Sequence, residues 1–90
     1  MTERRIESIR TRLATALEPI ELEITDESHK HIGHEGAKSG KGHFHVRIIS
    51  EQFQDLSPVR RHQLIYKSLG DLMDTDIHAL SIDAEAPAGI

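Results

Sequence analysis

The chain has 90 residues, no cysteine and a net charge of −4 at pH 7. This length makes one small domain, which has no disulfide and whose metal chemistry must rest on imidazole. The charged start of the chain lacks the apolar core of a secretory signal peptide, and no stretch is long enough to cross a bilayer, so we expect a cytoplasmic protein. The net acidity argues against a dedicated nucleic-acid binder.

A helix and a strand are predicted at the start of the chain. The helical stripe consists of Ile6, Ile9, Leu13, Ala16 and Leu17. This spacing predicts a helix with Thr2 as its cap and Pro19 as its end. The following residues alternate between apolar and polar, with Ile20, Leu22 and Ile24 on one side, which indicates a strand with one buried face.

A second strand follows after a long connection. Its two faces carry Phe44, Val46 and Ile48 on one side and His45, Arg47 and Ile49 on the other. Glu21 and Glu23 of the first strand can pair with His45 and Arg47 across an antiparallel hairpin, which favours direct pairing of the two strands. The connection, residues 26–42, is far longer than a hairpin needs, and segments of this length are usually functional or disordered.

A second helix and a third strand complete the pattern. Ser57 and Pro58 form an N-cap and first-turn signature for the helix. Its apolar stripe consists of Leu64, Ile65, Leu69, Leu72 and Met73. We expect Gly70 to weaken the helix without ending it, because the stripe continues beyond it. The last strand is predicted over residues 77–82.

This order predicts an α+β fold with a three-stranded mixed sheet and helices on one face. All 90 residues form a single domain, with a core at residues 3–83 and a flexible tail at 84–90. A right-handed crossover makes the second and third strands parallel, so both begin at the same edge of the sheet. His78, which opens the third strand, should therefore lie beside the histidine-containing connection.

Five of the seven histidines fall between residues 29 and 45. They are His29, His31, His34, His43 and His45. Histidine changes between a charged donor and a neutral metal ligand near pH 7, so the cluster indicates either a metal site or a solvated polar loop. An independent zinc site from His29, His31 and His34 has suitable ligand atoms but no clear fourth ligand.

Four blocks of the sequence, within residues 3–83, resemble the BolA family in the same order and at similar spacing. The blocks are DESHKHIGHEGA, GHFHVRIISEQF, LSPVRRHQLIYKSL and DIHALSI. The resemblance implies a type II KH-like fold of order α-β-β-α-α-β, with a short helix near Leu56 before the long one. It also implies a partnership with a monothiol glutaredoxin in iron–sulfur cluster handling and iron regulation, and some members are described as transcriptional regulators.

The resemblance also implies cluster ligands. His78 corresponds to the family's histidine at the start of the last strand, and His31 to its loop ligand, with His29 and His34 as rivals to His31. The implied [2Fe-2S] cluster is bridged to the glutaredoxin, which supplies a cysteine while glutathione supplies a second thiolate, so none is expected in the isolated chain. Imidazole ligands raise the cluster's reduction potential relative to an all-thiolate site. Asp55 replaces a family glycine, and aspartate tolerates the left-handed backbone.

DNA binding is the alternative function. From residue 28 to residue 67 the chain carries seven basic and three acidic residues. The candidate phosphate contacts are Arg47, Arg60, Arg61 and Lys67. Such contacts position a nucleic-acid backbone without reading sequence. A GxxG sequence at residues 33–36 lies between strands rather than helices, so it does not support a KH-type clamp, and the few aromatic residues favour weak binding.

Enzymatic activity is not expected from this sequence. No motif places a nucleophile, a base and an oxyanion donor together, and so small a domain has little room for a substrate pocket. Without its partner, we expect the chain to be a monomer or a weak homodimer that does not associate with membranes.

Overall fold

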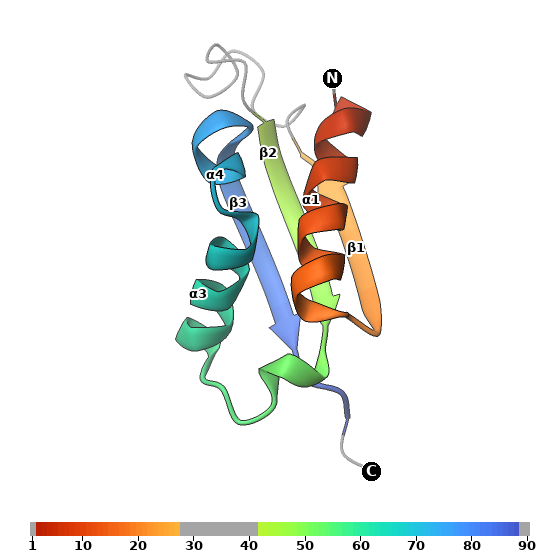
Figure 1. The fold of residues 1–90 in the computed structure, drawn as a ribbon, viewed down its shortest axis with the longest axis vertical. Coiled ribbons are helices and arrows are strands. Elements are labelled where there is room, and N and C mark those ends of the chain that lie inside the picture. Colours follow the sequence, from red (N-terminus) through yellow and green to blue (C-terminus); the bar gives the residue numbers. More distant parts are fainter. Residues whose placement is uncertain (1, 28–41, 89–90) are drawn as a thin grey trace.

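The computed structural model describes residues 2–27 and 42–88, and its elements confirm the predicted α+β fold (Figure 1). The helices are α1 (Thr2–Leu17), the short 3₁₀ helix η2 (Glu51–Phe53), α3 (Pro58–Leu69) and α4 (Leu72–Thr75). The strands are β1 (Glu21–Asp26), β2 (Gly42–Ile49) and β3 (Ile77–Glu85). Within the described residues, no helix is both long and apolar enough to cross a membrane.

The three strands form one sheet in the order β1-β2-β3. β1 and β2 are antiparallel, which confirms that the two strands pair directly. Glu23 lies opposite Arg47 as predicted, but His45 lies opposite Thr25, so the predicted pairing of a glutamate with His45 is wrong. β2 and β3 are parallel, with Gly42 opposite Ile77. The connection between them passes through α3 and α4, so both strands begin at the upper end of the sheet in Figure 1. The predicted parallel arrangement is thus confirmed.

The core lies between the sheet and the helices α1 and α3, which cover the same face (Figure 1). Phe44, Val46 and Ile48 of β2 are at most 2% exposed. The other buried apolar residues are Ile9, Leu13, Leu17, Phe53, Ile65, Leu69, Leu72 and Ile77. The intervening residues of β2 are less buried and lie on the helix-free face, which confirms the predicted alternation. Burial of these apolar side chains is the main source of stability in a small domain without disulfides.

The second helix ends earlier than its apolar stripe predicts. α3 ends at Leu69, and Gly70 follows it with φ = 54°, its N–H donating to the carbonyl of Tyr66. Glycine adopts a positive φ at little cost, which ends the helix here. The prediction that Gly70 weakens the helix without ending it is therefore wrong. Leu72 still reaches the core, at 9% exposed, because it belongs to the separate short helix α4.

The connection from β2 to α3 largely agrees with the features predicted from the sequence. η2 is the short helix expected before α3, although it lies at Glu51–Phe53 rather than at Leu56. Asp55 adopts φ = 64°, so aspartate keeps the left-handed turn that a glycine would make. Ser57 then caps α3, its Oγ accepting the N–H of Arg60 at 3.3 Å, with a proline in the first turn.

Two predicted boundaries need correction. Ala16 and Ile20 are exposed rather than part of the core, and Ile20 is 59% exposed because β1 starts only at the next residue. β3 continues to Glu85 because it stays paired with the end of β2. Ala84 and Glu85 therefore belong to the sheet and not to the predicted tail.

Candidate metal centre

His78 lies at the start of β3, beside the first residues of β2. The carbonyl of Asp76 accepts the N–H of Gly42 at 2.9 Å, and the Asp76 carboxylate pairs with Arg5 of α1 at 3.4 Å. These contacts hold the entry into β3 against both the neighbouring strand and the helical layer. The prediction that the crossover brings His78 to the edge where β2 begins is confirmed.

His78 lies at an irregularity in the pairing of β2 and β3. Gly42 is opposite Ile77, but His43 is opposite Ala79, so His78 is an extra residue between two paired positions. Ile77 is 2% exposed, whereas His78 and Ala79 are both exposed. Bulges of this kind re-aim side chains near strand ends. The His78 side chain is exposed, and within the described residues no hydrogen bond engages it.

His43 packs beside His78. The two ring centroids are 5.0 Å apart, and the ring planes are inclined at 48°. His43 is only 8% exposed and its Nε2 atom is buried, so His78 is the more accessible imidazole of the two. No pattern in the sequence singled out His43 from the cluster. The parallel start of β2 and β3 was the signal that could have found it, because it sets His43 opposite the first residues of β3.

The other clustered histidines are not all described. His45 lies further along β2, with Nδ1 2.8 Å from Ser81 Oγ of β3, and it is therefore held on the helix-free face. The predicted ligands His31 and His34, and their rival His29, lie outside the described residues. Within residues 2–27 and 42–88, no group of three or more His, Cys, Asp or Glu is placed to hold a metal ion.

The four predicted phosphate contacts lie on different surfaces, and Arg47 is separate from the rest. It belongs to the helix-free face of the sheet, where its Nη1 lies 3.5 Å from Glu21 Oε1 and 3.8 Å from Glu23 Oε2. These neighbouring carboxylates reduce the attraction of Arg47 for a phosphate group.

The other three basic residues belong to α3, but they play two roles. Arg61 supports the fold, since its Nε donates to the carbonyl of Leu56 and its Nη1 to the carbonyl of Ala84, each at 3.0 Å. Arg60 and Lys67 instead line one groove on the exposed side of α3.

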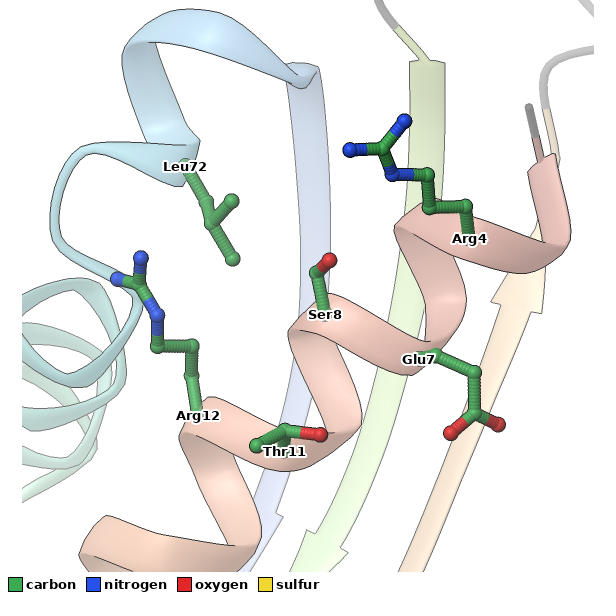
Figure 2. A pocket seen from close by; sticks show the side chains of 6 residues that line it. All are labelled: Arg4, Glu7, Ser8, Thr11, Arg12 and Leu72. Atoms are coloured by element: carbon green, nitrogen blue, oxygen red, sulfur yellow. The ribbon is translucent and has the colours of Figure 1, made fainter.

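A hollow of about 330 Å³ lies between α1 and α4 (Figure 2). It is lined by Arg4, Glu7, Ser8, Thr11, Arg12 and Leu72. Arg12 donates to the carbonyl of Leu69 at 2.9 Å and pairs with Asp71 at 3.0 Å, which ties α1 to the turn between α3 and α4. In Figure 2 the Glu7 carboxylate points away from the hollow. None of the predicted site residues lines the hollow. The contacts of Arg12 there join α1 to the end of α3 and therefore support the fold.

Comparison with known proteins supports the predicted family. Residues 13–89 match the family described as BolA-like protein. The chain is 44% identical over 87 residues to SufE-like protein 1, chloroplastic/mitochondrial, of Arabidopsis thaliana, covering 91% of this chain and 24% of that protein. It is 42% identical over 89 residues to Protein BOLA1, chloroplastic, of the same plant, covering 96% and 56%. The chain thus spans about a quarter and just over half of these relatives.

The similarity extends to structure and to a bacterial relative. The solved BolA domain of SufE1 from Arabidopsis thaliana matches with a TM-score of 0.81 at 45% identity, covering 97% of this chain and 95% of that chain. The DNA-binding transcriptional regulator BolA of Escherichia coli (strain K12) is 36% identical over 76 residues, covering 84% of this chain and 70% of that protein. Sequence and fold therefore agree over nearly the whole chain.

The names of the two plant relatives correct the prediction of a cytoplasmic protein. One is called chloroplastic/mitochondrial and the other chloroplastic, which points to an organelle rather than the cytoplasm. The cytoplasmic prediction is wrong because it rested on the lack of a secretory signal core. That feature excludes one targeting route and does not identify a compartment.

Proposed function

Because this chain belongs to the BolA-like family, we propose that it partners a monothiol glutaredoxin and shares a [2Fe-2S] cluster with it as cargo. The resulting role is in iron–sulfur cluster trafficking or iron regulation. Similarity to the BolA domain of SufE1 and to BOLA1 supports an iron–sulfur-related role in general terms. The observation that carries the finer proposal is the exposed imidazole of His78 at the sheet edge, with His43 packed against it.

The donor atoms at this edge suit such a cargo. Imidazole nitrogen is an accepted iron ligand in clusters where histidine replaces cysteine, and it raises the reduction potential relative to an all-thiolate site. These 90 residues contain no cysteine, so the thiolates come from the glutaredoxin and glutathione in this proposal. His78 supplies one imidazole, and His31, or one of its rivals His29 and His34, supplies another.

His43 acts as a positioning residue in this proposal. Its ring lies against the His78 ring and is itself almost fully buried, so it limits the orientations open to His78. Asp76 adds to this by holding the entry into β3 through Gly42 and Arg5. A ligand that is already ordered loses less conformational entropy when it binds, which favours capture of the cluster from a partner.

The proposal is tested with the 90-residue chain, a monothiol glutaredoxin, glutathione, ferrous iron and sulfide under anaerobic conditions. Visible absorption and circular dichroism of the mixture are compared with those of the glutaredoxin's own cluster. We expect a distinct spectrum for the mixture, because imidazole replaces thiolate at one iron. His78→Ala should restore the spectrum of the glutaredoxin alone.

His45→Ala is the matched control, because it removes an imidazole from the same strand pair at a position bonded to Ser81. It should leave the mixed spectrum unchanged. His29→Ala, His31→Ala and His34→Ala, made separately, decide which residue is the second ligand. An unchanged spectrum on mixing, or a mixed spectrum that survives His78→Ala, would overturn the proposal.

The structure gives less support to DNA binding, the function named for the Escherichia coli relative. Arg47 lies among carboxylates on the helix-free face, and Arg61 is bonded to two backbone carbonyls. Half of the predicted phosphate contacts are thus engaged elsewhere. The remaining two, Arg60 and Lys67, line an exposed groove on α3 together with apolar side chains.

A further inference from the structure

The exposed side of α3 carries a groove of about 260 Å³. Leu56 and Leu64, both partly buried, are its apolar lining, and Arg60, Gln63 and Lys67 are its polar lining. The two basic residues lie two turns of helix apart, which separates them by about 10 Å along the helix axis. The groove thus combines apolar surface with two spaced positive charges.

Neither of these charges is neutralised within the described fold. Across residues 2–27 and 42–88, ion pairs engage arginines of α1 and β2 but not the side chains of Arg60 or Lys67. No carboxylate of these described residues lines the groove, although the chain has 15 acidic and 11 basic residues. Two cations without a carboxylate partner form a surface that attracts negative charge.

Exposed apolar side chains lie on the same helix. Val59 is 65% exposed and Tyr66 is 41% exposed. Aromatic side chains and arginine are enriched in the contact regions of protein–protein interfaces, and exposed apolar groups that cluster mark such regions. The outer side of α3 therefore offers apolar contact area beside its two cations.

We propose that this α3 groove binds an acidic amphipathic segment of a partner protein. A bulky aliphatic side chain of the segment packs against Leu56 and Leu64, and carboxylates on both sides of it pair with Arg60 and Lys67. A volume of about 260 Å³ is slightly below the roughly 300–1,000 Å³ of small-molecule sites, and it suits one or two side chains of a longer segment. The inference does not rest on cluster binding, because His78 is not among the groove's lining residues.

Nucleic acid fits this surface less well. Two phosphate contacts predict a slope of only about −2 for the logarithm of the binding constant against the logarithm of salt concentration, which is typical of weak binding. The apolar lining from Leu56 and Leu64 has no counterpart in a phosphate backbone. An aliphatic side chain flanked by carboxylates uses both parts of the groove.

The test uses the 90-residue chain and a fluorescein-labelled synthetic peptide in which leucines are flanked by glutamates. Fluorescence anisotropy gives the dissociation constant, and amide chemical shifts map the contact. We expect saturable binding with shifts concentrated between Leu56 and Lys67. Arg60→Glu and Lys67→Glu should each weaken binding about tenfold or more, because they place a carboxylate against a carboxylate.

Two controls separate this site from general attraction. Arg10→Glu makes the same charge change at a partly exposed arginine of α1 that pairs with Glu7, and it should leave the dissociation constant nearly unchanged. A peptide with serine in place of leucine should bind about tenfold more weakly, because it cannot bury an aliphatic side chain.

Several results would overturn the inference. One is an equal effect of Arg10→Glu, and another is equal affinity for the serine peptide. Tighter binding of a duplex DNA to the same residues would assign the surface to nucleic acid. Self-association of the chain that Lys67→Glu abolishes would assign it to a second copy, and a lack of saturable peptide binding would leave the groove without the proposed partner.

Discussion

The histidine pair and the α3 groove are built in opposite ways. His43 and His78 lie on different strands, and they meet because β2 and β3 run parallel from the same edge of the sheet. Arg60 and Lys67 lie on one helix, and they share a side because two turns separate them. The histidine pair therefore depends on the whole fold, whereas the groove depends on one helix and on how that helix is anchored.

The largest expected effect is on stability, at Ile65, the residue that anchors α3 in the core. Ile65 is fully buried, so Ile65→Ala should lower the free energy of unfolding by about 2–5 kcal/mol through lost burial and a cavity. Val59→Ala, on the exposed side of the same helix, should change it by less than about 0.5 kcal/mol. Urea unfolding followed by circular dichroism measures both. Equal losses would show that the two sides of α3 do not differ as described.

Neighbouring arginines give the next contrast. Arg61→Met removes two hydrogen bonds to backbone carbonyls and should lower the free energy of unfolding by about 1–3 kcal/mol. Arg60→Met removes an exposed side chain that the fold does not engage and should change it by less than about 0.5 kcal/mol. The same urea titration measures both variants. A larger loss for Arg60→Met would mean that Arg60, not Arg61, supports the fold.

Sequence reasoning predicted the elements well, because each has its own periodicity. The alternation in β2 and the cap at Ser57 are local signals, and both are confirmed. Gly70 was misread because the apolar stripe continues in α4, so periodicity alone cannot tell one helix from two. The end of β3 was missed because pairing with β2, not composition, extends it to Glu85.

The candidate site was only partly predictable for a related reason. Topology was enough to bring His78 to the start of β2. The register shift at His78 is a property of two strands together, so no single stretch of sequence reveals it. His43 was missed because it contacts His78 across the irregular pairing of β2 and β3. The different roles of Arg60 and Arg61 were likewise not predictable, because the backbone carbonyls that Arg61 binds are brought to it only by the folded structure.

The smallest expected effect tests the dependence of the histidine pair on the fold. His43→Ala removes a nearly buried ring and should lower the free energy of unfolding by about 1 kcal/mol. It should also shift the imidazole proton resonances of His78, because the ring centroids are 5.0 Å apart. Arg60→Met should leave these resonances unchanged, since it alters only the outer side of α3. If the His78 resonances do not shift in His43→Ala, the two rings do not pack against each other in solution. His43 then has no positioning role, even if His78 binds the cluster.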